Sequence, residues 1–268
     1  MSTLLRVIRA SPTLLRVGFA QAIAYRSEFL IWLLSTNMPI IMLFLWRAVA
    51  REAPIGRYGA AEFSAYFLST LVVRLLTGSW VIWEMNYEIR NGSLANRLLR
   101  PLHPFIWYAA ENLAAFPFRL LICLPIAGGT LFWLGPSRFT ADPIQWAILP
   151  LAILGSWCIT FAVMATIGTL GLYWESSVAL FHLWLGLFFI LSGYTIPLEL
   201  FPPWLLSPVQ WLPFRFQLSF PVEVLLGLVS RRESLFLLSV QWLSVALLFS
   251  LALLLWRRGL KHYAAYGG

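Results

Sequence analysis

The stretch YEIRNGSLANRLLRPLHP, residues 87–104, interrupts a chain that is otherwise mostly apolar. It contains the turn dipeptide Asn91-Gly92, followed by a segment with helical spacing that starts at Leu94. Pro101 ends that segment, because proline lacks the N–H group that a helix interior needs. The stretch therefore predicts an ordered loop, with a short helix of its own, between two long apolar segments.

The composition around this loop is that of an integral membrane protein. The 268 residues are 60% hydrophobic and 11% charged, with a mean hydropathy of +0.78, whereas soluble domains carry about 25% charged residues. We expect an all-α membrane domain that fills the chain, residues 1–268, with six transmembrane helices, since a bilayer core requires roughly 20 apolar residues per span. The predicted spans lie near 28–50, 63–83, 106–134, 144–172, 178–200 and 235–256.

The basic residues indicate how these spans are oriented. An excess of Lys and Arg marks the inner loops of a membrane protein. With both termini inside (N-in, C-in), ten basic residues fall on inner segments and seven on outer ones. A short amphipathic helix within residues 1–27 is expected to lie along the membrane surface before the first span.

The loop, taken as residues 84–105, has a simple interpretation and a more specific one. Ser93 is expected to cap the helix, after which Leu94 and Leu98 share one face and Arg97 and Arg100 another. The simple interpretation is a basic loop that only sets topology. The specific interpretation is a docking helix, with a leucine face for the groove of a partner and arginines for its acidic rim.

The same loop resembles that of the ABC-2-type exporter permeases, and is closest to a bacterial branch of ABC transporter permeases. In that branch an Ile-x-x-Gly-x-Leu run is followed by Leu-Leu-x-Pro-x-x-Pro. The matching residues here are Ile89, Gly92, Leu94, Leu98, Leu99, Pro101 and Pro104. The resemblance implies that the loop, including Arg97 and Arg100, is a coupling helix seated on a separate ATP-hydrolysing subunit.

The chain itself has no sequence for ATP binding. A phosphate-binding loop needs Gly-x-x-x-x-Gly-Lys-Ser/Thr, and the single lysine, Lys261, is followed by His262. The chain is therefore expected to be a transport subunit and no enzyme, without a cofactor of its own. ATP and Mg would be bound by the partner ATPase.

The resemblance also implies the partners and the location. Two copies of an ABC ATPase subunit are expected, with a second permease that is a related but different chain or otherwise a second copy. The expected location is the bacterial cytoplasmic (inner) membrane, among membrane lipids, with no nucleic-acid partner. The resemblance does not identify the substrate.

The segment 193–228, between the fifth and sixth predicted spans, is irregular. Within the run SGYTIPLELFPPWLLSPVQWLPF (192–214), five prolines forbid one continuous helix. The segment is nonetheless too apolar for an ordinary wet loop. We expect broken, re-entrant helices in the outer leaflet; the alternative is an aromatic-rich segment on the outer surface. Glu199 is expected to face a substrate exit.

Three charges fall inside the second and third predicted spans: Arg74, Glu111 and Arg119. A charge at the bilayer centre costs about 2.5–3.5 kcal/mol on insertion scales, so such residues face protein or water. The structural interpretation is an Arg74–Glu111 pair that locks two helices together. The functional interpretation is that some of these charges line the substrate path.

Two other functions remain as alternatives. A membrane-embedded enzyme acting on a lipid-linked substrate would need clustered carboxylates, histidines or a metal site, whereas His103, His182 and His262 are far apart in the sequence. A passive channel or scaffold would not need a docking helix. The resemblance implies the membrane permease of an ATP-driven exporter that moves its substrate outward by alternating access, and we prefer this function to the two alternatives.

Overall fold

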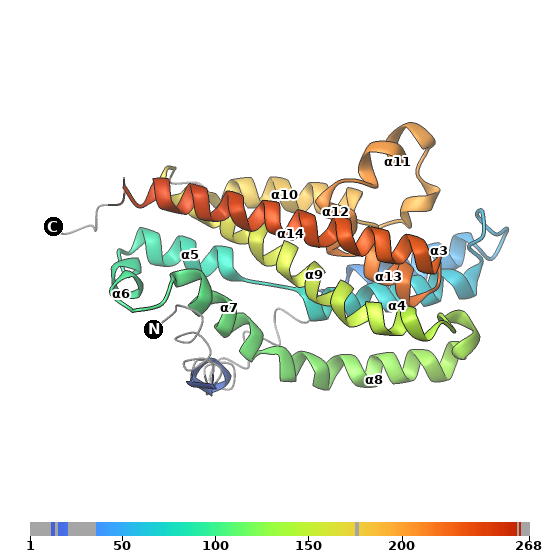
Figure 1. Cartoon of the computed structure of the whole chain (residues 1–268). Helices are drawn as coiled ribbons and strands as arrows, with labels where there is room; N and C mark the ends of the chain where they lie inside the picture. Colours follow the sequence, from blue (N-terminus) through green and yellow to red (C-terminus); the bar gives the residue numbers. More distant parts are fainter. Residues whose placement is uncertain (1–11, 14–15, 21–35, 175–176, 262, 264–268) are drawn as a thin grey trace.

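The computed structural model describes residues 12–13, 16–20, 36–174, 177–261 and 263. In these residues the regular elements are helices, ordered as α3 Met38–Val49, α4 Ala60–Thr77, α5 Val81–Arg90, α6 Leu94–Leu98, α7 Pro104–Ala114, α8 Phe116–Leu134, η1 Pro136–Arg138, α9 Pro143–Thr169, η2 Leu170–Leu172, α10 Ser177–Leu191, η3 Leu198–Leu200, α11 Pro203–Val209, α12 Pro213–Gln217, α13 Ser219–Leu225 and α14 Arg231–Gly259. The long helices run roughly side by side (Figure 1).

Four helical segments of the described chain are long and apolar enough to cross a membrane: Ala60–Arg90, Pro104–Leu134, Pro143–Leu172 and Arg231–Gly259. The helices α3 and α10 are apolar but shorter. The count of six spans therefore stays a prediction, and residues 28–35 of the first predicted span lie outside the described residues. The fifth predicted span ends earlier than expected, because α10 stops at Leu191 and Gly193 adopts a φ of 84°.

Helix α9 is the centre of the packing. Asp142 caps it by accepting a hydrogen bond from the Ile144 N–H at 2.9 Å, and Pro143 stands in the first turn, where its missing N–H has no cost. Helices α14, α5, α13, α12, α10 and α4 all pack against it. Its buried positions run almost without interruption from Gly155 to Thr169, as expected for a helix surrounded by protein.

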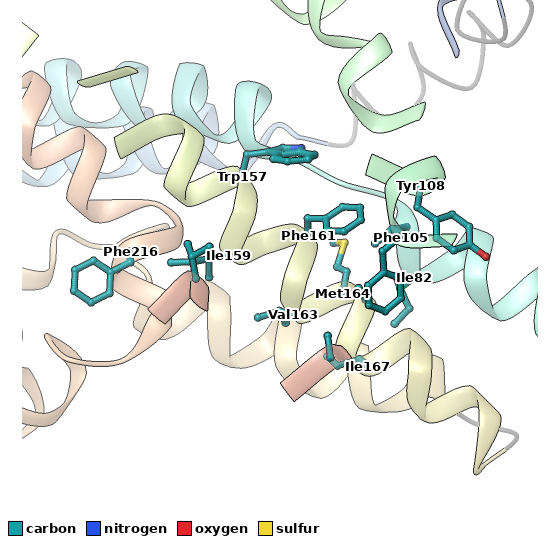
Figure 2. Close-up of a cluster of buried hydrophobic side chains, with 14 of the residues drawn as sticks. Ile82, Phe105, Tyr108, Trp157, Ile159, Phe161, Val163, Met164, Ile167 and Phe216 are labelled. Carbon is teal, nitrogen blue, oxygen red and sulfur yellow. The ribbon is translucent and has the colours of Figure 1, made fainter. Parts of the chain in front are cut away.

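The main apolar cluster joins α9 to the helices on either side of the loop that contains α6. Figure 2 shows Phe161 and Met164 of α9 grouped with Phe105 of α7 and Ile82 of α5. Each of these side chains is at most 5% exposed. Apolar packing therefore places α5 and α7 against α9.

Two of the long spans are broken rather than continuous. Helix α4 ends at Thr77, and Gly78 is extended (φ −62°, ψ 151°) before α5 begins at Val81. The other break, between α7 and α8, lies at Ala115 and is followed by Pro117. Pro117 has no N–H group to donate to the carbonyl four residues before it, and its ring crowds that carbonyl, which explains why the predicted span 106–134 is interrupted there.

The segment between α10 and α14 forms short helical pieces, η3 and α11 to α13, as the prolines predict. Helices α12 and α13 are buried against α9, with Phe216 and Phe220 fully buried. The Phe216 carbonyl accepts hydrogen bonds from the Ser156 hydroxyl at 2.7 Å and the Gln241 amide at 3.0 Å. Helix α11 projects outward (Figure 1), with Trp204 75% exposed. Whether any of these pieces is re-entrant stays a prediction.

Most of the predicted surface helix within residues 1–27 lies outside the described residues. The described parts, 12–13 and 16–20, are helical. Gly18 lies so close to α7 that an added Cβ would be 2.6 Å from the Cβ of Ala114. The Phe19 ring stacks on Phe118 of α8 at 5.1 Å. This piece therefore packs beside the α7–α8 break.

Candidate functional site

The candidate site is the loop between α5 and α7, which lies at one end of the molecule (Figure 1). Helix α5 continues through Arg90, so the loop is shorter than the predicted 84–105. Gly92 makes the turn with a φ of 77°, a conformation that glycine adopts without strain. Its carbonyl accepts a hydrogen bond from the Tyr263 hydroxyl at 3.1 Å, which ties the turn to the chain beyond α14.

The turn is closed differently from the prediction. Ser93 stands at the N-cap position of α6, but its side chain makes no capping hydrogen bond. Asn91 instead accepts hydrogen bonds from the Ser93 N–H at 2.9 Å and the Ser93 hydroxyl at 2.6 Å. The asparagine therefore orders the loop, as such side chains do in turns.

The predicted leucine docking face is wrong. Leu94 is fully buried, and Leu98 packs against the main apolar cluster together with Ile89 of α5. Both leucines hold α6 to its own subunit, Leu94 completely and Leu98 in part, so little of that face is left for a partner. The five-residue helix is thus fixed in orientation by burial of its apolar side.

The surface that α6 and its flanks expose consists of other residues. We call it the α6 surface: Tyr87, Arg90, Asn96, Leu99, Arg100 and Pro101, all of them exposed. Leu99 is 85% exposed and Tyr87 69% exposed. The Arg100 guanidinium lies over the Trp107 ring at 4.3 Å. Leu99 is thus an exposed apolar residue that could anchor a partner, with arginines beside it.

The second predicted docking arginine, Arg97, points the other way, into a cluster of carboxylates. Its Nε donates to both carboxylate oxygens of Glu88, at 2.7 and 2.8 Å, and Nη2 donates to Oε1 of Glu84 at 2.7 Å. Nη1 lies 3.1 Å from Oε1 of Glu111 on α7. The Tyr108 hydroxyl donates to Glu88 at 2.6 Å, and the guanidinium lies 4.2 Å from the Tyr108 ring centre.

This cluster joins three helices through one side chain. Arg97 comes from α6, Glu84 and Glu88 from α5, and Glu111 from α7. Burial acts to lower the pKa of Arg97, but the surrounding carboxylates outweigh it and raise the pKa above the ordinary value. The arginine stays charged, so the connection is a set of charge-assisted hydrogen bonds with a fixed fork geometry.

The predicted Arg74–Glu111 pair is also wrong. Glu111 is taken by Arg97, and the Arg74 guanidinium lies over the Phe188 ring of α10, 5.1 Å from its centre. The reason is the Gly78–Trp80 break, which separates the helix that carries Arg74 from the α5 segment beside Glu111. The predicted pair was based on helix spacing and required the second span to be one continuous helix.

Arg119 has a structural role at that break. It is 2% exposed, and its Nη1 donates to the carbonyls of Leu76 at 3.1 Å and Gly78 at 2.6 Å. These carbonyls lie where α4 ends and has no further helical partner. Beside it, Asn112 of α7 accepts hydrogen bonds from the Ser79 hydroxyl at 2.9 Å and the Trp80 N–H at 3.4 Å. The two breaks are therefore bonded to each other.

Glu199 lies in η3, at the end of the molecule away from α6. It accepts hydrogen bonds from Arg57 at 2.5 Å and from the Tyr58 hydroxyl at 3.2 Å. Burial and the adjacent Glu199 charge raise the pKa of Tyr58. Glu199 thus joins η3 to the α3–α4 connection, and its expected place at a substrate exit stays a prediction.

Sequence reasoning missed Glu84, Glu88 and Tyr108. One signal was present: Glu84 and Glu88 are four residues apart and so share a helix face, next to buried Met85 and Ile89. The sequence did not show that Arg97 is the partner of these two carboxylates, because Arg97 reaches them only after the chain reverses at Gly92. In the part of the chain that the structure describes, no group of three His, Cys, Asp or Glu residues could hold a metal ion.

Comparison with known proteins identifies one family. The family described as "ABC-2 family transporter protein" matches residues 36–267, which is most of the chain. None of the curated proteins matches it.

Proposed function

The chain belongs to the ABC-2 family of transporter proteins, and from this premise we propose that it is the membrane permease of an ATP-driven exporter. A separate ABC ATPase, in two copies, would bind ATP and Mg and supply the energy. The permease would pair with a related chain or a second copy in the bacterial inner membrane. The observation that carries the proposal is Arg97, which connects the loop to two long spans.

The ATPase would dock on the α6 surface. Leu99 would enter an apolar pocket of the ATPase, and Tyr87 with Arg90 and Arg100 would surround it. Aromatic and arginine side chains around one apolar anchor are typical of the residues that dominate binding energy at interfaces. The buried Leu94 and the partly buried Leu98 would keep α6 from being pulled away from the permease.

Movement of the ATPase would pass into the membrane through the Arg97 cluster. Helices α5, α6 and α7 are held to one another by this cluster and by the apolar packing of Ile82 and Phe105. Both spans are interrupted just beyond it, at Gly78–Trp80 and at Ala115. The three helices would therefore turn as one lever about the paired breaks, and α4 and α8 would change their relative positions.

The test is co-purification and ATP hydrolysis with the ATPase encoded beside this chain. Leu99→Asp should lose association and turnover while the permease keeps its thermal unfolding temperature, since the side chain is 85% exposed. Trp204→Asp is the matched control, because it also places a carboxylate at an exposed apolar residue, but at the opposite end of the molecule. Association that survives Leu99→Asp would refute docking at the α6 surface, and the absence of any associated ATPase would refute the exporter.

A further inference from the structure

Arg74 is a charged residue of the α4 helix that the lever does not use. It lines a small cavity together with Thr160, Phe181, Trp184, Phe188 and Gln217. These residues come from α4, α9, α10 and α12, so the cavity lies between helices of one subunit. Its volume of about 20 Å³ is room for roughly one water molecule.

The positive charge at this cavity lacks an acidic partner in the described residues. No carboxylate there lies within 4 Å of the Arg74 guanidinium, whose polar neighbour is the Tyr194 hydroxyl. Arg119 is an electrostatic neighbour of the same sign. An arginine inside an apolar helix pair, with no carboxylate of the described residues within reach, creates a local potential that attracts an anion.

A second polar group at the cavity also has unused capacity. Gln217 is 3% exposed, and its Oε1 has no hydrogen-bond partner. Its Nε2 lies 3.5 Å from the Thr160 hydroxyl, which is a long contact. Buried polar groups are nearly always paired, so an unpaired one needs an explanation. Because the oxygen and the NH₂ group of an amide exchange places when it rotates by 180°, the unpaired position can instead present an N–H donor, and a ligand that accepts a hydrogen bond there supplies an explanation.

The rest of the wall is aromatic and comes largely from one helix. Phe181, Trp184 and Phe188 all belong to α10, a helix of 15 residues in which only three, Ser177, Phe181 and Phe188, are buried. A ligand larger than one water molecule would require α10 to move outward, and that movement would enlarge the cavity. The cavity then offers an apolar, aromatic wall and a cationic, hydrogen-bonding end.

We propose that this cavity is a binding site for an amphipathic anion, a lipid-soluble molecule with a single phosphate or carboxylate head. Arg74 pairs with the head, the Gln217 amide donates to it, and the α10 aromatic side chains cover the apolar body. This arrangement follows the general pattern of ligand pockets, which are mostly apolar with a few converging polar groups. Describing the ligand as exported cargo rests on the proposed function, but the binding itself does not.

Arg74 also lies close to the lever. It is in the last turn of α4, four residues before the break at Gly78. A ligand that moves Arg74 or α10 therefore acts next to the hinge. This position would let occupancy of the cavity influence the movement that the ATPase drives.

The experiment measures binding to the full chain in neutral maltoside micelles, without any ATPase. The probes are dodecyl phosphate, dodecyltrimethylammonium and inorganic phosphate. Binding of each is measured by the shift of the unfolding temperature with probe concentration. Wild type should bind dodecyl phosphate at least about tenfold more tightly than either of the other two. Arg74→Gln should weaken that binding by about tenfold to a hundredfold, as expected for loss of a charge-assisted hydrogen bond, and Arg74→Lys should retain part of it.

Two further variants make the result decisive. Gln217→Leu, which leaves both arginines in place, should weaken dodecyl phosphate binding several-fold, and this variant decides the matter if Arg74→Gln does not fold. Arg57→Gln removes an exposed arginine at the far end and should leave binding unchanged. Equal binding of the anionic and cationic probes, or unchanged binding in the Arg74 and Gln217 variants, would overturn the proposal. Equal binding of inorganic phosphate would overturn the amphipathic part of it.

These outcomes are independent of the ATPase test. If the chain binds dodecyl phosphate through Arg74 but recruits no ATPase, the binding site is supported and the exporter function is refuted. If the chain recruits its ATPase but binds no anion, the exporter function is supported and the binding site is refuted.

Discussion

The Nη2 atom of Arg97 lies 2.7 Å from Oε1 of Glu84, although the two residues belong to different helices on either side of a tight turn. This bond, with the one to Glu111 on α7, makes α5, α6 and α7 parts of one unit. The side chain of Arg97 is only 9% exposed, so water screens the connection little. A residue that spacing assigned to the docking surface thus connects that surface to the membrane spans.

Arg97→Gln should destabilise the permease by about 3–5 kcal/mol, because it leaves buried carboxylates without their cation. The side chains of Glu84, Glu88 and Glu111 would then have no cation among them. The check is the free energy of unfolding in denaturant, with Arg90→Gln as the control, since Arg90 is exposed and makes no ion pair within the described residues. A loss in the Arg97 variant no larger than in the control, within about 0.5 kcal/mol, would show that the cluster does not hold the unit together.

Arg119→Met should loosen the α4–α5 break. The substitution leaves the Leu76 and Gly78 carbonyls without their buried donor, a cost of about 1–3 kcal/mol. Amide hydrogen exchange at residues 78–82 should become faster than in wild type. Arg258→Met, at an exposed position of α14, serves as the control and should leave that exchange unchanged. Equal protection in both variants would mean that packing alone fixes the break.

Gly155→Ala should destabilise the contact between α9 and α14. An added Cβ would lie 2.6 Å from the Gln241 side chain, which cannot move without losing hydrogen bonds to the carbonyls of Ala152 and Phe216. Overpacking of this kind costs about 1–3 kcal/mol. The measurement is the unfolding temperature of the purified chain.

Gly128→Ala is the matched control for that prediction. Nothing lies within 4 Å of a Cβ added at Gly128 of α8, and replacing glycine inside a helix gains about 0.5–1 kcal/mol. The two glycine-to-alanine changes should therefore shift the unfolding temperature in opposite directions. A shift of the same sign in both would contradict the close approach of Gln241 to α9.

His103 should make stability fall in mild acid. Burial and the nearby Arg257 lower the pKa of His103 below its ordinary value of about 6.5. As the pH falls through about 6.5, the unfolded chain takes up a proton that the folded chain does not, so the folded state loses stability. His103 Nδ1 also accepts the Phe105 N–H at the start of α7, and protonation removes that acceptor.

His103→Asn isolates this effect, because asparagine is a good N-cap and does not titrate. Unfolding temperatures measured between about pH 7.5 and 5.5, the range around the ordinary histidine pKa, should fall less in the variant than in wild type. An equal fall in both would place the acid sensitivity elsewhere.

Much of the fold was present in the local sequence. The apolar runs near 144–172 and 235–256 became long helices, and the proline-rich run 192–214 became short helical pieces, because length, hydropathy and proline chemistry act locally. Asn91-Gly92 made the predicted turn, since glycine tolerates the positive φ that the reversal requires. The family resemblance also rested on residues that can be read along the chain.

The sequence by itself determined that this is an apolar, helical chain with an ordered polar loop between two long spans. Only the tertiary structure decided which side of that loop faces outward. Leu94 and Leu98 could satisfy their apolar character against a partner or against α9 and α5, and the choice depends on neighbours far away in the chain. Arg97 pairs with carboxylates, whereas Arg74 lines a cavity. The breaks at Gly78–Trp80 and Ala115 change the direction of side chains that a continuous helix would have placed together.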